Sequence, residues 1–161
     1  MFYIDLFAAL DRFHVQYLLI GGLAVTLHGV ERATMDVDIT VALTPTNLNA
    51  LIATAKELKL SPVLPVPLNA LKDIDQLKKW HQERHLEAFA LRTADVAGLT
   101  LDVLLFPPIE FEGMAQRAVE FNVGGVPVRT AAINDLIALK KAVGRPVDLS
   151  DIEHLQRIKA L

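Results

Sequence analysis

The stretch of sequence that decides the fold runs from residue 17 to residue 41 and reads YLLIGGLAVTLHGVERATMDVDITV. An apolar run, Tyr17–Ile20, ends in Gly21-Gly22, and a short helical segment follows at Leu23–His28. Two glycines at a turn from a strand into a helix allow a phosphate to approach the backbone N–H groups at the N-terminus of the helix. The pattern therefore predicts a strand, a phosphate-binding turn and a helix, in that order.

The end of this stretch alternates acidic and apolar residues. Asp36 and Asp38 alternate with Val37, Ile39 and Val41. Side chains at positions i and i+2 of a strand share one face, so a strand over Asp36–Ala42 places both carboxylates together and turns the apolar residues to the core. Like charges held side by side repel each other. A hard divalent cation such as Mg²⁺ or Mn²⁺ is the simplest group to neutralise them.

Two further polar residues, Arg32 and Thr34, lie just upstream of the aspartates. If the strand begins that early, Thr34 continues the register of Asp36 and Asp38 and shares their face. Arg32 is a candidate substrate-binding group, and its alternative role is an ion pair with Asp36. Taken alone, an Asp-x-Asp motif is common at surfaces and a Gly-Gly pair is usually a turn. Their combination in this order favours nucleotide chemistry.

A third carboxylate stands in the segment LTLDVLLF, residues 99–106, where Asp102 is the one charged residue. An isolated Asp among Leu and Val is costly unless something pairs with it. If this strand lies beside Asp36–Ala42, Asp102 completes a cluster of three carboxylates, which could hold two Mg²⁺ ions. The alternative is an Asp on the solvent-facing side of an edge strand.

The composition sets further bounds. A length of 161 residues favours a single domain over residues 1–161, and 52% hydrophobic residues with a mean hydropathy of +0.35 allow a substantial core. A net charge of −3 gives no overall basic surface for nucleic acid. Because there is no cysteine, disulfides, thiolate metal sites and a catalytic thiol are excluded. No signal peptide or membrane span is recognisable, so we expect a cytoplasmic protein with no membrane partner.

Periodicity and turn signals predict a mixture of helices and hairpins, which indicates an α+β fold: a mixed β-sheet with flanking helices. Helices are expected at residues 4–14, Leu23–His28, 44–58, Asp73–His85, Phe111–Arg117, Ile133–Val143 and Asp148–Ile158. Strands are expected at Tyr17–Ile20, Asp36–Ala42, Leu86–Arg92, Leu99–Phe106, Val119–Val123 and Val126–Arg129. The third and fourth of these strands form a predicted hairpin whose loop ends at Gly98. Ser61–Pro67, with three prolines, is expected to be a loop or an edge segment.

One pair of histidines has a spacing that can hold a metal. His81 and His85 stand four residues apart on the polar helix predicted at residues 73–85. The residues between them match neither zinc-protease motif, so a solvated helix face is the favoured interpretation.

These motifs resemble those of the nucleotidyltransferase superfamily that shares the DNA-polymerase-β-like core. The resemblance rests on Gly21-Gly22, on R-x-T-x-D-x-D over residues 32–38, on Asp102, and on DLIALKKAVGRPVDLSDIEHL over residues 135–155. It extends from about Phe13 to Leu155, and residues 62–85 match no motif of the family. Within the superfamily, the chain looks most similar to compact bacterial nucleotidyltransferases of the toxin–antitoxin and abortive-infection type.

The resemblance implies a Mg²⁺- or Mn²⁺-dependent enzyme whose catalytic metal ligands are Asp36, Asp38 and Asp102. In the superfamily, the third carboxylate either ligates metal or activates the acceptor. The nucleotide-binding positions implied are Gly21, Gly22, Arg32, Thr34, Lys140 and Arg145. Two positions depart from the family pattern. The widespread Gly-Ser turn is Gly-Gly here, which removes a hydroxyl ligand for phosphate, and Val147 stands where a basic residue is frequent.

The two C-terminal basic residues also have structural interpretations. Lys140 and Lys141 end a predicted helix, where cations offset the helix dipole. Arg145 can pair with Asp148, which is itself expected to cap the last helix. As an exposed residue at a helix end, Lys140 is expected to add little to stability.

The resemblance implies transfer of an NMP unit from an NTP to an acceptor hydroxyl, with release of pyrophosphate. The small size of the chain favours RNA or a protein as the acceptor, and leaves room for a cognate antitoxin or a second subunit that completes the site. Two alternatives stay open: a non-catalytic nucleotide- or partner-binding module on the same fold, and a nucleotidyltransferase that modifies small molecules such as antibiotics.

Overall fold

The computed structural model describes residues 2–34, 36–95 and 99–161. The helices are α1 (Phe2–Arg12), α2 (Gly21–Leu27), α3 (Pro45–Glu57), the 3₁₀ helix η1 (Leu68–Lys72), α4 (Ile74–Arg84), α5 (Phe111–Arg117), α6 (Ile133–Val143) and α7 (Pro146–Lys159). The strands are β1 (Tyr17–Ile20), β2 (Val37–Val41), β3 (Ser61–Pro62), β4 (Ala88–Arg92), β5 (Thr100–Leu104), β6 (Val119–Val123) and β7 (Val126–Thr130). The predicted α+β class, a mixed sheet with flanking helices, is confirmed.

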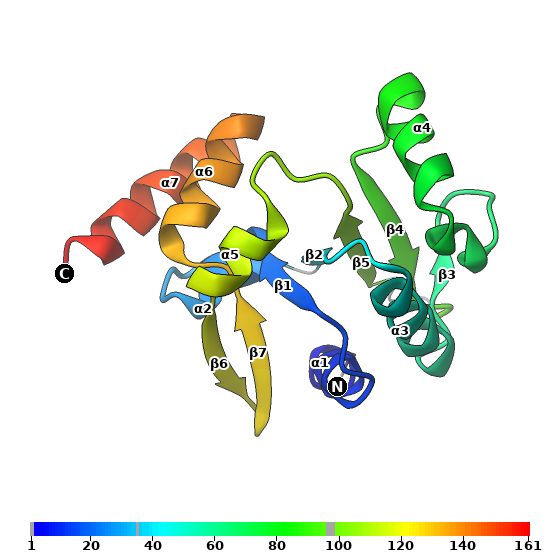
Figure 1. Ribbon diagram of the computed structural model, residues 1–161. Coiled ribbons are helices and arrows are strands. Elements are labelled where there is room, and N and C mark those ends of the chain that lie inside the picture. The colour runs from blue at the N-terminus through cyan, green and yellow to red at the C-terminus, as the bar shows by residue number, and fades with distance from the viewer. Residues whose placement is uncertain (1, 35, 96–98) are drawn as a thin grey trace.

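All seven strands belong to one mixed sheet in the order β3-β4-β5-β2-β1-β7-β6. The pairs β2–β5 and β1–β7 are parallel, and the other four pairs are antiparallel. Strands β1, β2 and β5 therefore lie inside the sheet, between α6 and α7 on one side and α3 and α4 on the other (Figure 1). This central position explains why Tyr17–Ile20 reads as a continuous apolar run, since every residue of β1 is buried.

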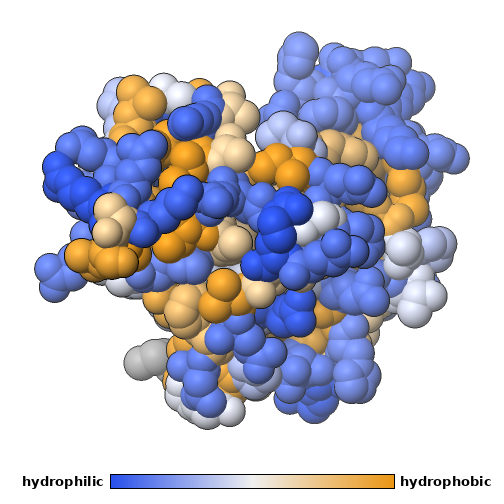
Figure 2. Space-filling model, turned by 60° about the vertical axis from the view of Figure 1, so that its left-hand side comes forward, coloured by the Kyte–Doolittle hydropathy of each residue, from blue (hydrophilic) through white to orange (hydrophobic). Residues whose placement is uncertain are grey.

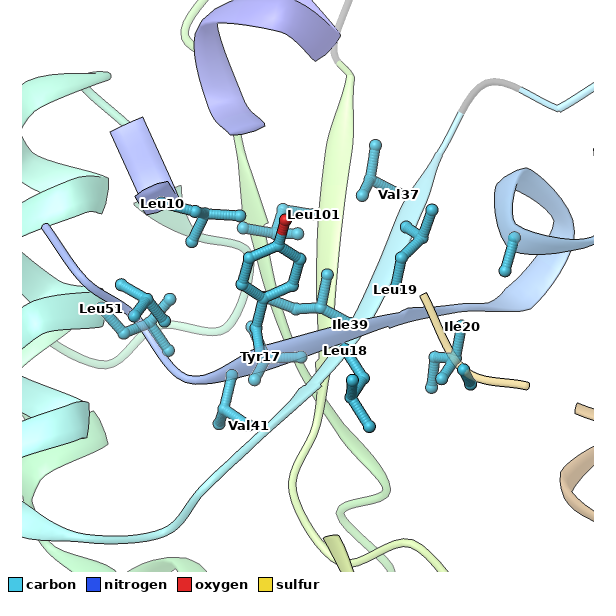
Figure 3. Packing of buried hydrophobic residues seen from close by; sticks show 14 of the residues in the cluster. Leu10, Tyr17, Leu18, Leu19, Ile20, Val37, Ile39, Val41, Leu51 and Leu101 are labelled. Carbon is cyan, nitrogen blue, oxygen red and sulfur yellow. The ribbon is translucent and has the colours of Figure 1, made fainter. Parts of the chain in front are cut away.

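The hydrophobic core joins this sheet to the helices. Figure 3 shows side chains of β1, β2 and β5 meeting Leu10 from α1 and Leu51 from α3, all of them buried. Val37 and Ile39 of β2 are fully buried and Val41 nearly so, as the alternating pattern predicted. Burial of each such side chain contributes about 1.5–3 kcal/mol, which makes the central strands a rigid base for the polar residues between them.

The elements on either side of the glycine turn, α2 and β2, begin at other residues than expected. Helix α2 begins directly at Gly21, without the intervening residues that the sequence suggested, because Gly21 adopts a φ of +74° that ends β1 and starts the helix within one residue. Strand β2 begins at Val37, so Asp36 and Thr34 lie outside it. The strand is therefore shorter than the predicted Asp36–Ala42, and the condition under which Thr34 would share the register of the aspartates is not met.

The C-terminal helices also begin and end differently. Helix α6 ends as predicted at Gly144, whose φ of +71° gives a left-handed C-cap. Helix α7 begins at Pro146 with Arg145 as N-cap, so Asp148 is not the cap residue. Its carboxylate instead accepts the Arg145 backbone N–H at 3.1 Å, as the third residue of a capping box does.

The middle of the chain contains one unexpected element. Residues 61–62 form the short edge strand β3, in line with the edge segment expected there, and η1 follows at Leu68–Lys72. Strands β4 and β5 pair as the predicted antiparallel hairpin, whose loop end at Gly98 lies outside the described residues. His81 Nδ1 donates to the backbone carbonyl of Leu86 over 2.8 Å, a hydrogen bond that ties the side chain to the residues directly after α4.

On the face drawn in Figure 2, hydrophobic residues gather in patches between hydrophilic ones and do not form one continuous apolar surface. The exposed large apolar residues include Val143, Val147 and Leu149 around the turn between α6 and α7. Among the residues that the structure describes, no helix has both the length and the apolar character that a bilayer span requires.

Candidate active site

Two of the predicted carboxylates face each other in the middle of the sheet. Asp38 of β2 is the register partner of Asp102 of β5. Their side chains are hydrogen-bonded to each other. The neighbours in the same row are Ile20 of β1 and Ala90 of β4. The alternative of Asp102 on an edge strand is therefore excluded, because β5 has a strand on each side.

The two carboxylates share an environment that disfavours ionisation. Burial first, and then the nearby Asp102 and Asp36 carboxylates, raise the pKa of Asp38 against the lowering effect of the Lys140 charge, and together these causes bring it to about 6. Burial also raises the pKa of Asp102, with the charge of Asp36 as the next cause. The hydrogen bond between the pair raises the pKa of Asp38 and lowers that of Asp102. Both carboxyls therefore have a raised pKa, and burial with like charge disfavours the state in which the two are ionised together.

The third predicted ligand, Asp36, is less tightly placed. It precedes β2 and is exposed, although its charge acts on both Asp38 and Asp102. Within residues 2–34, 36–95 and 99–161, no group of three or more His, Asp or Glu side chains is arranged so that it could hold a metal ion. Of the three expected carboxylates, Asp38 and Asp102 are in direct contact, and Asp36 is not part of that contact.

The glycine turn packs against the carboxylates and the upstream loop. A Cβ at Gly21 would lie 2.8 Å from Cβ and Cγ of Asp38 and closer still to Oδ2. A Cβ at Gly22 would lie 3.0 Å from Cζ of Arg32 and 3.1 Å from Oγ1 of Thr34. Gly21 therefore leaves room for the Asp38 side chain. Gly22 leaves room for Arg32 and Thr34, which belong to the loop before β2. This packing places Arg32 and Thr34 beside the turn.

The three predicted basic residues converge on α7. Lys140 places Nζ 2.9 Å from Asp151 Oδ2 and 3.7 Å from Asp148 Oδ1. Arg32 forms an ion pair with Asp151 through Nη1. Arg145 donates to the Asp148 carboxylate from Nε over 2.8 Å and from Nη2 over 3.2 Å. Arg32 is thus paired with Asp151, not with Asp36, and the structural interpretation of Arg145 is confirmed.

Lys140 differs most from its expected setting. Only 7% of Lys140 is exposed, whereas its neighbour Lys141 is exposed. The premise that Lys140 is an exposed helix-end residue is therefore wrong, since its ammonium is buried with two carboxylates near it. The prediction treated the end of α6 as surface because the sequence does not show that α7 folds back over it.

Sequence reasoning missed Asp151 and assigned Asp148 to a cap. Both are almost fully buried, at 4% and 2% exposure. The hydrogen bonds from Arg145 lower the pKa of Asp148, and those bonds raise the pKa of Arg145. One signal was available: Asp148 and Asp151 are spaced i and i+3, which puts them on one face of a helix directly after a basic segment.

Two of the three predicted ligands, Asp38 and Asp102, are placed so that their oxygens fit a divalent cation. Asp38 and Asp102 provide hard oxygen ligands, and their raised pKa values reflect charge that a cation would neutralise. Asp36 is near enough to act on both electrostatically. A Mg²⁺ or Mn²⁺ ion held by the pair would draw its remaining ligands from Asp36, water or substrate phosphates.

Solved structures with the same architecture were found by comparison. The chain superimposes on the antibiotic-resistance factor ANT(2″)-Ia with a TM-score of 0.61 and 18% identity, over 97% of this chain and 80% of that one. It superimposes on the lincomycin-bound lincosamide antibiotic adenylyltransferase LnuA with a TM-score of 0.61 and 17% identity, over 98% and 94%. A third match is an antigenic nucleotidyltransferase-like protein from Paracoccidioides brasiliensis, with a TM-score of 0.54 and 17% identity, over 93% and 71%.

The chain has the nucleotidyltransferase fold. This conclusion follows from the shared α+β architecture, which extends over nearly the whole chain. No protein-family model matches the sequence, and no curated protein matches it either. At identities of 17–18%, the comparisons establish the fold alone.

Proposed function

We propose that this protein is a nucleotidyltransferase, which moves an NMP unit from an NTP to an acceptor hydroxyl. The observation that carries the proposal is the pairing of Asp38 with Asp102 across β2 and β5, directly beside the Gly21 turn. Two acids packed together in the centre of a sheet cost stability, so their juxtaposition is better explained by a cation or a reaction than by folding.

The reaction forms one bond and breaks one. The acceptor hydroxyl oxygen attacks the α-phosphorus, the bond from that phosphorus to the oxygen bridging to the β-phosphorus breaks, and pyrophosphate leaves with the bonding electrons. The hydroxyl proton goes to a carboxylate. Asp102 suits this role because a carboxyl whose pKa is raised is a better base than one with its ordinary value.

The remaining site residues bind and orient the triphosphate. The turn at Gly21 and Gly22 lets phosphate oxygens approach the backbone, with the Thr34 hydroxyl beside it. Arg32, Lys140 and Arg145 supply positive charge at the same end of the sheet. Asp38 and Asp102, with Asp36, would hold Mg²⁺ or Mn²⁺, which when bound supplies neutralisation of the triphosphate charge.

Two classes of acceptor suit the proposed reaction. The size of the chain no longer argues against a small molecule, because this chain matches 94% of LnuA, whose structure contains lincomycin. A structure of ANT(2″)-Ia is likewise a complex with adenylyl-2″-tobramycin. A hydroxyl of a small polar molecule of antibiotic type is therefore the first candidate acceptor. An RNA or protein acceptor in a toxin–antitoxin pair, with a partner subunit completing the site, is the second.

The test is transfer of label. The protein is incubated with each α-³²P-labelled NTP and Mg²⁺ or Mn²⁺, together with lincosamides, aminoglycosides, total RNA or total protein. Label on a small molecule supports the first acceptor class, and label on RNA or protein supports the second. The Asp38→Asn variant should abolish transfer, and Asp75→Asn, an exposed residue of α4, should not. Binding of an NTP without any transfer under these conditions would return the protein to the class of non-catalytic binding modules.

A further inference from the structure

The strongest feature outside the carboxylate pair is an ion network built on two buried acids of α7, which we call the α7 network. It consists of the carboxylates of Asp148 and Asp151 and of the three cations that they hold, Arg32, Lys140 and Arg145. Asp148 and Asp151 are one helical turn apart on the same face of α7 and are 2% and 4% exposed. Groups so buried must be paired, and both of them are.

The three cations come from three different segments of the chain. Arg32 belongs to the loop between α2 and β2, Lys140 to the end of α6, and Arg145 to the N-cap of α7. Their charged groups meet only because Asp148 and Asp151 draw them together. Without these two acids, the three long side chains would lose the ion pairs that fix their charged groups.

The α7 network also reaches the carboxylate pair. Arg32 contacts Gly22 of the turn, and Gly21 contacts Asp38. The charge of Lys140 lowers the pKa of Asp38, and the charge of Asp38 is one of the causes that raise the pKa of Arg145. The cations are therefore held at the end of the sheet where the proposed triphosphate site lies.

The charges of the α7 network do not cancel. Three cations face two carboxylates on α7, and the charges of Lys140 and Arg145 extend as far as Asp38 at the proposed metal site. A polyanion such as a triphosphate adds further negative charge to cations whose positions are already fixed, so little conformational entropy is lost when it binds.

We propose that Asp148 and Asp151 are positioning residues that hold Arg32, Lys140 and Arg145 in place for the phosphates of the nucleotide. This inference rests on the proposed function, since it concerns the same nucleotide site. The two acids touch no substrate; they act through the cations that do.

A simpler electrostatic account gives the opposite sign. If Asp151 were only a countercharge, its removal would leave more net positive charge and would tighten the binding of an anion. If Asp151 positions Arg32 and Lys140, its removal releases both and weakens binding. The direction of the change therefore separates the two accounts.

The experiment uses the full chain and measures binding by calorimetry, with Mg²⁺-ATP and with inorganic tripolyphosphate as probes. Asp151→Asn should weaken the affinity for tripolyphosphate about tenfold or more, the usual effect of losing charge-assisted contacts. Glu153→Gln is the matched control, because it removes the same charge from an exposed position of the same helix that pairs with Arg157. It should leave both affinities unchanged.

A double variant that lacks both cations distinguishes a positioning role of Asp151 from a general structural defect. In Arg32→Ala/Lys140→Ala, the two cations that Asp151 holds are gone, so adding Asp151→Asn should not weaken tripolyphosphate binding further. A structural role would cause the same additional loss in both backgrounds. If Asp151→Asn does not fold, Asp151→Glu carries the test: it keeps the charge but displaces the carboxylate by one methylene, and weaker binding is again expected.

The outcomes are distinct. Unchanged or tighter tripolyphosphate binding by the Asp151 variant overturns the positioning role and leaves the proposed function intact. A wild-type protein that binds neither Mg²⁺-ATP nor tripolyphosphate overturns the proposed function itself, and the positioning role with it.

Discussion

Asp38 and Asp102 are register partners on the parallel strands β2 and β5, and their carboxyl groups are hydrogen-bonded in the interior of a seven-stranded sheet. The pair is assembled by backbone pairing between segments more than sixty residues apart in the sequence. A site held by the sheet in this way is fixed before any ligand arrives.

The stability of the protein should depend on pH through Asp38. Its pKa is raised from an ordinary value of 3.8 to about 6, mainly by burial. Between these two values the folded state keeps a proton that the unfolded state has lost, so the free energy of unfolding falls as pH rises through this window and is level above it. Asp38→Asn lacks this titration. Its stability relative to wild type should therefore increase from about pH 4 to about pH 6, as measured by denaturant unfolding, and a difference that is constant across this range would contradict the raised pKa.

Divalent cations should stabilise the protein once the pair is ionised. Above about pH 6, Mg²⁺ or Mn²⁺ with ATP is expected to raise the melting temperature, because a ligand at 100 times its Kd adds about 2.7 kcal/mol to the stability of the folded state. Below that pH the shift should shrink, since the cation must displace the proton. Asp38→Asn and Asp102→Asn should lose most of the shift and Asp75→Asn should keep it. Equal shifts in all of these variants would exclude the carboxylate pair as the metal site.

Lys140 should matter both to stability and to nucleotide binding. Lys140→Ala removes a buried cation that lies 2.9 Å from Asp151 and 3.7 Å from Asp148, so we expect a loss of about 2–4 kcal/mol in the free energy of unfolding. Affinity for Mg²⁺-ATP should fall about tenfold. The exposed neighbour Lys141 is the control, and Lys141→Ala should change stability by less than about 0.5 kcal/mol. Similar results for the two lysines would show that Lys140 has no special role.

Gly21 should be irreplaceable for two separable reasons. A Gly21→Ala side chain would be strained at a φ of +74° and would also collide with Asp38. Gly125 has a similar φ of +86° with nothing within 4 Å of its Cβ position, so Gly125→Ala reports the backbone strain alone, about 1 kcal/mol. Gly21→Ala should cost about 2–4 kcal/mol and should also abolish the cation-dependent rise in melting temperature. If the two variants behave alike in both measurements, Gly21 serves the turn and not the site.

Local patterns in the sequence were sufficient for most of the secondary structure and for the face of each strand. The period-2 alternation at residues 36–42 correctly placed Val37, Ile39 and Val41 in the core, because a strand has only two faces. Turn chemistry identified the hairpin of β4 and β5, and periodicity gave the end of α6 at Val143. The same local reasoning misplaced the start of α7, where a proline and an arginine, not the expected Asp148, begin the helix.

The sequence by itself determined which chemical groups this protein carries and on which local elements they stand: the glycine turn, two aspartates two residues apart, and a lone Asp102 in an apolar strand. Only the tertiary structure decided which groups meet. Strand order brought Asp102 beside Asp38 and left Asp36 outside the strand, and the packing of α7 over α6 buried Lys140 and set Asp148 and Asp151 against three cations. The physical reason is range: propensity and periodicity act over a few residues, whereas charge pairing and burial depend on segments that become neighbours only when the whole sheet and its helices have formed.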